Sequence, residues 1–161
     1  MTDNFDKFIE RVLAHEGGYV NNPRDPGGET QWGISKRSYP NVDIKRLTRD
    51  QAKEIYRRDF WLAAGCDRMP PLVGFQLLDG AVNSGISRAT QWLQRAAGVT
   101  ADGKIGPKTL GAVQAADPND LCYLFNAERL GFMTDLKTWD TFGRGWARRI
   151  VENLRWAAKD N

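Results

Sequence analysis

Hydrophobic residues recur at helical spacing along most of the chain. The first hydrophobic stripe repeats at i, i+3, i+4, i+7 and i+8 and comprises Phe5, Phe8, Ile9, Val12 and Leu13. This spacing predicts an amphipathic helix that is capped by Thr2 or Asp3 and ends at Gly17-Gly18. The segment from residue 19 to residue 34 differs, because it is rich in Asn, Pro, Asp and Gly and its apolar residues alternate. That pattern predicts a short β-hairpin or a long ordered loop.

The remaining hydrophobic segments also have helical spacing. The most apolar one begins at Pro70-Pro71 and ends before Gly85, and its hydrophobic residues occupy all faces, which predicts a buried central helix. Four further helices are expected to begin at the capping-box residue Thr48, near Ala89, at Pro107 and at Pro118. The last helix carries a hydrophobic stripe made of Phe142, Trp146, Ile150, Leu154 and Ala157. The chain is therefore predicted to be mainly helical with one small β excursion, an α+β fold.

The composition limits the chemistry. The chain has 161 residues (18.1 kDa), and its proportions of hydrophobic and charged residues are those of an ordinary globular protein. It is long enough to bury a core without disulfides. Cys66 and Cys122 fit no disulfide framework and no metal-ligand spacing, so two buried free thiols are expected. His15 is the single histidine, which excludes a multi-histidine metal site. A Ser-His-Asp triad would have to use His15 as its base. We expect no metal and no cofactor.

The sequence also bears on where the protein folds. The N-terminal residues have neither a basic region nor an apolar core of the kind found in signal peptides. The longest charge-free stretch, from Met69, is ten residues and too short to span a bilayer. The protein is therefore expected to fold in the cytoplasm of the cell that makes it.

The net charge of +3 comes from the last 25 residues, which hold six Lys or Arg against three Asp or Glu. Four of the basic residues share the polar face of the last helix: Arg144, Arg148, Arg155 and Lys159. This face has three interpretations: a solvated surface, a contact with an anionic cell envelope or membrane surface, or nonspecific attraction to nucleic acid. The small net charge argues against this nonspecific nucleic-acid binding as the main function, and no specific nucleic-acid partner is expected.

Glu16 is the first candidate for chemistry. It continues the hydrophobic stripe of the first helix and lies in the last turn before the glycine pair. A carboxyl at that position loses part of its hydration and lies near the negative end of the helix dipole, and both effects disfavour ionisation. A carboxylic acid that stays protonated near neutral pH is what glycoside cleavage requires of its general acid. The alternative interpretation is a solvated glutamate at a frayed helix end.

The segment after Glu16 supplies possible partners. Asp25 follows nine residues later, and two carboxylates across a cleft suit acid/base hydrolysis of a sugar bond. Thr30 is a candidate for orienting a water molecule, and Trp32 for stacking on a sugar face. The structural alternatives are an Asx turn for Asp25, an ordinary strand residue for Thr30 and core packing for Trp32.

The segment from residue 15 to 35, HEGGYVNNPRDPGGETQWGIS, resembles the signature of glycoside hydrolase family 108. Members of this family are phage endolysins and bacterial muramidases with a lysozyme-like fold. The family pattern is Glu-Gly-Gly-Tyr, then Pro-x-Asp-x-Gly-Gly-x-Thr, then Gly-Ile-Thr, and this chain departs from it only at Ser35. A later segment, ADGKIGPKTL from Ala101, resembles the predicted peptidoglycan-binding region that commonly follows in this family. The two resemblances cover nearly the whole chain.

The resemblance implies a lysozyme-like catalytic region over residues 1–96 and a helical peptidoglycan-binding region over residues 97–161, packed into one globule. It assigns the catalytic acid to Glu16 and aligns Asp25 with the family's aspartate. It implies cleavage of the β-1,4 bond between N-acetylmuramic acid and N-acetylglucosamine, and a role in phage-induced host lysis. Such an enzyme, expected to be a monomer, would leave the host cytoplasm through a separate pore, a holin.

Several alternatives stay open at this point. Asp25 would activate water for inversion or act as a nucleophile, according to the separation of the two carboxyls. If Glu16 acts without it, a lytic transglycosylase that uses a hydroxyl of the substrate is the alternative. A noncatalytic peptidoglycan-binding module is a third. Further candidates for lining a sugar cleft are Tyr19, Asn83 and Gln91. His15 adjoins Glu16 but points about 100° away from it on a helix, so it is not expected to act directly.

Overall fold

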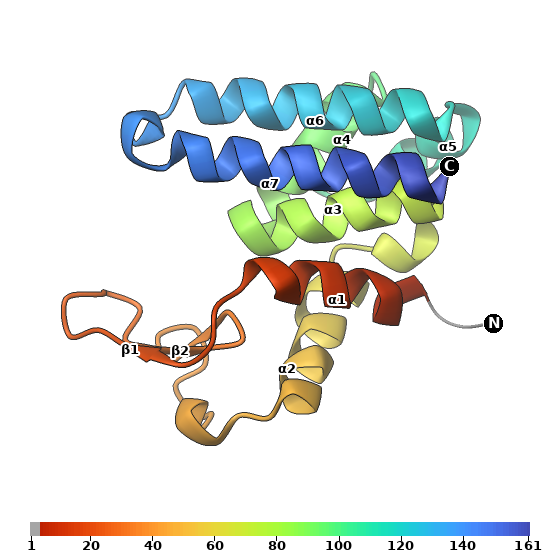
Figure 1. Ribbon diagram of the computed structural model, residues 1–161. Helices are drawn as coiled ribbons and strands as arrows, with labels where there is room; N and C mark the ends of the chain where they lie inside the picture. Colours follow the sequence, from red (N-terminus) through yellow and green to blue (C-terminus); the bar gives the residue numbers. More distant parts are fainter. Residues whose placement is uncertain (1–3) are drawn as a thin grey trace. The chain divides into compact units, whose positions relative to one another are not determined.

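The computed structural model describes residues 4–161, so the proposed caps Thr2 and Asp3 lie outside the described residues (Figure 1). The helices and strands, in chain order, are α1 (Asn4–His15), β1 (Val20–Asn21), β2 (Glu29–Gln31), β3 (Ile34–Ser35), α2 (Arg49–Tyr56), α3 (Pro71–Ser84), α4 (Ile86–Ala96), α5 (Pro107–Ala115), α6 (Pro118–Thr134) and α7 (Trp139–Asp160). Short 3₁₀ turns cover Ile44–Arg46 and Cys66–Arg68, and a π-helical segment, Arg57–Leu62, follows α2. The α+β, mainly α fold is confirmed.

The described chain forms two compact units, one ending at Asp59 and the other beginning at Phe60. We call them the N-terminal unit and the C-terminal unit. The boundary that we predicted between residues 96 and 97 concerns the division of function and stays a prediction.

The N-terminal unit combines α1, the sheet and α2. The predicted stripe of α1 is buried, with Phe8 and Ile9 at most 1% exposed. The strands form an antiparallel sheet in the order β1-β2-β3, in which Thr30 pairs with Val20 on one side and with Ser35 on the other. The predicted capping box of α2 is also present, because Thr48 and Gln51 exchange side-chain and backbone hydrogen bonds.

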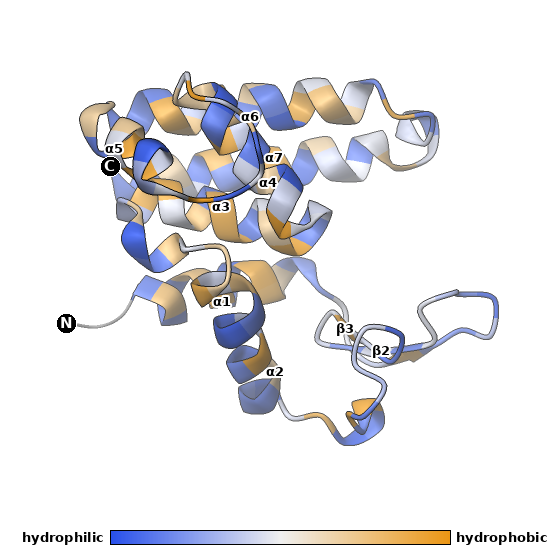
Figure 2. Cartoon of the chain, turned by 180° about the vertical axis from the view of Figure 1, so that it is seen from behind, coloured by the Kyte–Doolittle hydropathy of each residue, from blue (hydrophilic) through white to orange (hydrophobic). Residues whose placement is uncertain are grey.

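The C-terminal unit is built around α3. This helix contacts α4, α6 and α7, and its residues from Leu72 to Ala81 are all buried. Figure 2 shows hydrophobic residues along much of it, so the predicted central helix is confirmed. Helices α6 and α7 run antiparallel to each other (Figure 1). Cys66 and Cys122 are buried free thiols, as expected, and burial raises the pKa of Cys122 to about 11.

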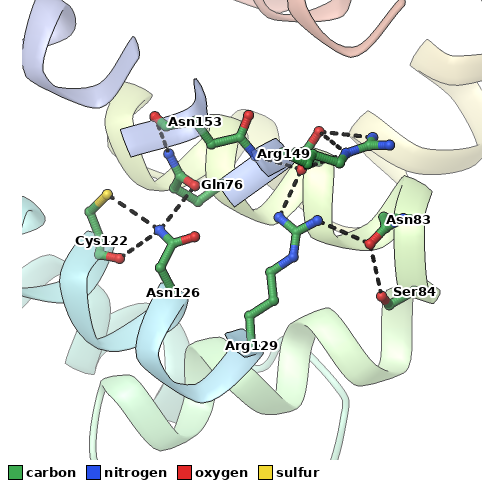
Figure 3. Close-up of polar contacts among 9 residues, drawn as sticks. Gln76, Asn83, Ser84, Cys122, Asn126, Arg129, Arg149 and Asn153 are labelled. Carbon is green, nitrogen blue, oxygen red and sulfur yellow. Dashed lines mark hydrogen bonds and ion pairs between the residues drawn. The ribbon is translucent and has the colours of Figure 1, made fainter. Parts of the chain in front are cut away.

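A charged residue lies inside this unit, on the central helix. Asp79 is fully buried, and its carboxylate accepts hydrogen bonds from Arg129 of α6 at 2.7 Å and from Arg149 of α7 at 2.9 Å (Figure 3). Asn153 of α7 donates to the same carboxylate, at 2.6 Å. Burial by itself would raise the pKa of Asp79, but the two guanidinium groups outweigh it and hold that pKa well below its usual range. Three helices are thus joined through one ionised carboxylate.

This cluster corrects our prediction for the last helix. Ile150 and Ala157 are buried as predicted, but Phe142 is 53% and Leu154 is 37% exposed. The inward positions are taken by Asn153, which binds Asp79, and by Gly143, which packs against the Trp139 ring. The polar face is exposed as expected, at Arg144, Arg148, Arg155 and Lys159.

Two further properties concern the described residues as a set. No helix between residues 4 and 161 is long and apolar enough to cross a membrane. Within the same range, no three His, Cys, Asp or Glu side chains are grouped so that they could hold a metal ion.

Removing the charge of Arg129 should destabilise the protein strongly. We expect Arg129→Met to lower the free energy of unfolding by about 3–5 kcal/mol, because it leaves the buried Asp79 carboxylate short of a partner. Arg155→Met is the matched control, since Arg155 pairs with Glu152 on the exposed face of α7. Urea denaturation of both variants measures the difference. Equal stabilities would show that the cluster does not hold the helices together.

Candidate active site

Glu16 directly follows α1, and its backbone N–H still donates to the carbonyl of Leu13 at 3.2 Å. The side chain is half-buried. It packs against the turn between β2 and β3, because a methyl group built on Gly33 would lie 3.0 Å from both Cγ and Cδ of Glu16. The predicted position of Glu16 facing the interior of its unit is consistent with this contact.

The turn against which Glu16 packs is tight and strained. It consists of Trp32 and Gly33, which join the paired residues Gln31 and Ile34, and both turn residues have positive φ, +53° and +77°. Two positive φ values in a two-residue hairpin loop are the pattern of a type I′ turn. Glycine adopts this conformation without strain, but for a tryptophan it costs about 1–2 kcal/mol.

Hydrogen bonds hold the strained turn in place. The hydroxyl of Tyr56, in the last turn of α2, donates to the carbonyl of Trp32 at 2.8 Å. The Trp32 indole N–H and the Gln31 amide both donate to the carbonyl of Leu47, at 3.2 and 3.0 Å. The Tyr56 hydroxyl also lies against Gly33, on the side that faces Glu16. Residues from α1, the hairpin and α2 therefore meet around the Glu16 side chain.

Asp25 lies in the loop between β1 and β2 and is exposed. Its Oδ1 accepts a hydrogen bond from the N–H of Gly27 at 2.8 Å, and its carbonyl accepts one from Gly28 at 3.0 Å. This is the Asx turn that we considered as the structural alternative. The turn does not exclude a role in chemistry, because the exposed carboxylate remains accessible to water.

The sheet carries two more of the candidate residues. Thr30 occupies the middle of the central strand and is half-buried. Tyr19 is exposed, and its hydroxyl donates to Oε1 of Glu29 at 3.0 Å. Desolvation and this hydrogen bond raise the pKa of Tyr19. Next to Thr30 lies Glu29, a half-buried carboxylate that we did not predict as a candidate, although its place in an alternating segment was a usable signal.

The candidates in the C-terminal unit lie on α3 and α4. Asn83 is in the last turn of α3 and accepts a hydrogen bond from Arg129 at 3.1 Å. Gln91 is half-buried on α4. The structure thus brings Glu16, Trp32 and Tyr56 together around Gly33, whereas Asn83 and Gln91 belong to the other unit.

The segment with the second resemblance forms a loop that leads into α5. Gln94, buried on α4, holds this loop by donating to Asp102 at 2.8 Å and to the Lys104 carbonyl at 2.9 Å, and by accepting from Gly103. The hydrogen bond from Gln94 lowers the pKa of Asp102. A pocket of about 420 Å³ opens between Val99 and Thr109. The loop is therefore held to α4 by Gln94 and borders this hollow.

Comparisons with known proteins give one family match for each of these two segments of the chain. A family model described as Glycosyl hydrolase 108 matches residues 9–85, and one described as Predicted Peptidoglycan domain matches residues 88–151. The solved structure of Brucella abortus SagA is 35% identical, and the match covers 99% of this chain and 96% of that chain with a TM-score of 0.88. No protein with curated annotation matches the chain.

Alanine at position 33 tests the packing around Glu16. We expect Gly33→Ala to lower the free energy of unfolding by about 2–4 kcal/mol, because the methyl group overlaps the Tyr56 hydroxyl and the backbone has a positive φ. Gly111→Ala is the control, since an added methyl group there meets nothing within 4 Å and alanine favours the helix. Thermal or urea unfolding gives both values, and an unchanged Gly33→Ala protein would refute the described contact.

Proposed function

We propose that this chain, which belongs to the glycosyl hydrolase 108 family, cleaves the β-1,4 linkage between N-acetylmuramic acid and N-acetylglucosamine. The family and the peptidoglycan domain establish the coarser statement, that the protein is a glycoside hydrolase acting on peptidoglycan. The linkage itself is our inference from the resemblance of residues 15–35 to muramidases.

The observation that carries the proposal is the packing of Glu16 against Gly33. A general acid must hold its proton at a fixed point beside the glycosidic oxygen, and misplacement lowers the rate. The Trp32-Gly33 turn, fixed by Tyr56, supplies such a point from the backbone of the sheet. We therefore assign Glu16 the role of the acid that protonates the leaving sugar.

Asp25 and Thr30 are assigned the second half of the reaction. Asp25 deprotonates the attacking water if the two carboxyl groups lie about 6.5–9.5 Å apart during the reaction. It acts as nucleophile or charge stabiliser if they lie about 5–5.5 Å apart. Thr30 orients the water from the central strand. If Asp25 proves dispensable, the remaining route is that of a lytic transglycosylase, in which a hydroxyl of the substrate displaces the leaving group.

Four side chains are proposed to contact the glycan. Trp32 offers an aromatic ring in the turn beside Glu16, and Tyr19 offers a phenol just before β1. Asn83 and Gln91 would contact sugars from the C-terminal unit. The pocket formed by residues 99–109 is proposed to retain the protein on the wall.

The biological setting that we propose is lysis of a bacterial host by a phage-encoded enzyme, which acts as a monomer and without metal or cofactor. It would collect in the host cytoplasm and reach the wall through a holin pore. We propose that the exposed basic face of α7 contacts the anionic envelope, and we expect no specific nucleic-acid partner.

Replacing Glu16 by glutamine tests the proposed function. We expect Glu16→Gln to reduce the release of soluble fragments from purified peptidoglycan by at least about 10²-fold, because general acid catalysis typically contributes that much. Asp25→Asn should also reduce it if Asp25 is the base, and should leave it unchanged in a transglycosylase. Glu54→Gln, an exposed exchange on α2, is the matched control. Full activity of Glu16→Gln would refute the assignment, and an inactive wild type that still sediments with peptidoglycan would favour the noncatalytic binding module.

A further inference from the structure

The C-terminal unit contains a second hollow that the catalytic assignment does not use. It has a volume of about 300 Å³ and lies where the end of α3 and the start of α4 face α6 and α7. Its lining includes Asn83, Ser84, Arg88, Phe132, Leu136 and Trp146. Aromatic and apolar walls with a few polar groups are typical of a small-ligand site, and the volume is at the lower end for one.

Asn83 has a fixed amide orientation in this pocket. The guanidinium of Arg129 carries donors only, so the Asn83 oxygen must be the atom that faces it, at 3.1 Å (Figure 3). Ser84 donates to the same oxygen at 3.4 Å. The Asn83 Nδ2 group then has no hydrogen-bond partner within residues 4–161, on a side chain that lines the pocket. It offers two N–H donors to a bound molecule.

The orientation of Asn83 depends on the buried charges behind it. Arg129 is fully buried, and its other terminal nitrogen donates to Asp79, which is itself held by Arg149 and Asn153. The guanidinium therefore has no freedom to turn, and it presents one N–H to Asn83. Arg129 is in this sense a positioning residue for the Asn83 amide.

The charged groups at the pocket are hydrogen-bond donors and favour a ligand with an acceptor oxygen. Arg129 shares the Asp79 carboxylate with Arg149, and the guanidinium of Arg88 lies over the Phe132 ring with its centre 4.0 Å from the ring centroid. A neutral N–H donor beside aromatic and aliphatic surface matches an acetamido group, which combines a carbonyl acceptor with a methyl group.

We propose that this pocket binds the N-acetyl group of a peptidoglycan sugar, with Asn83 Nδ2 donating to the acetamido oxygen. The methyl group packs against the apolar wall that includes Leu136 and Trp146. This inference rests on the proposed function, because it takes the glycan strand as the substrate. It adds the chemical group that the protein selects and the residues that select it.

The test measures binding rather than catalysis. The protein carries Glu16→Gln so that the ligand survives, and it is titrated with the trimer of N-acetylglucosamine while the indole N–H signals are followed by NMR. We expect the Trp146 signal, assigned with Trp146→Phe, to shift. Adding Asn83→Asp should weaken binding about tenfold, because it removes the donors and sets a carboxylate against the acetamido oxygen.

Asn83→Asp is chosen because it retains an acceptor for Arg129 and therefore keeps the fold, and Asn41→Asp, at an exposed loop position, is the matched control. In the active protein, Arg129→Lys should raise KM for peptidoglycan and leave kcat unchanged, since a single-point donor cannot hold Asp79 and Asn83 together.

Three results would overturn the proposal: equal affinity of the Asn83→Asp protein, a trimer that shifts other indole signals but not that of Trp146, or a stem peptide that shifts Trp146 where the trimer does not. Failure of the proposed function is recognised separately, because a protein without hydrolytic activity still gives a binding curve.

Discussion

A carboxylate that has lost its water must be compensated by charge and hydrogen bonds, and Asp79 is such a group at the centre of the C-terminal unit. Its partners come from α6 and α7, so the contacts that neutralise it also fix how those helices pack on α3. The same constraint extends outward. Arg129 reaches Asn83 because Asp79 holds it, and Asn83 lines a pocket at the end of α3. Fold and candidate subsite in this unit thus share one network.

In the N-terminal unit the constraint is different, because there the position of an acid at the end of a helix has to be fixed. A glutamate after the last turn of α1 has many rotamers, and the packing of the Glu16 side chain against Gly33 restricts them. Gly33 allows close approach because it has no side chain, and Tyr56 holds the turn that contains it. The positive φ of Trp32 is the strain that this arrangement requires.

Local sequence patterns were sufficient to predict the helices and part of the candidate site. The stripe of α1, the capping box of α2 and the all-round apolar α3 each depend on residues close in sequence, and each is confirmed. The long-range polar contacts were not predictable. An aspartate within an apolar helix gives no sign that its partners lie 50 and 70 residues further on, and for the same reason the exposure of Phe142 and Leu154 was predicted wrongly. From the sequence alone, Tyr56 would likewise be assigned to the core of α2, because nothing nearby in the sequence indicates that its hydroxyl binds the Trp32 carbonyl. The roles of Asp25 and Thr30 stay predictions, because a loop residue and a strand residue acquire a function through the substrate.

The proposed function requires hydrolysis of one defined bond, and the chemical identity of the product tests it most directly. Purified peptidoglycan is digested with the wild-type protein in water enriched in ¹⁸O, and the fragments are identified by mass spectrometry. We expect fragments that end in reducing N-acetylmuramic acid and carry one ¹⁸O atom from the attacking water. Anhydro-muramic ends without the label, or reducing N-acetylglucosamine ends, would contradict it.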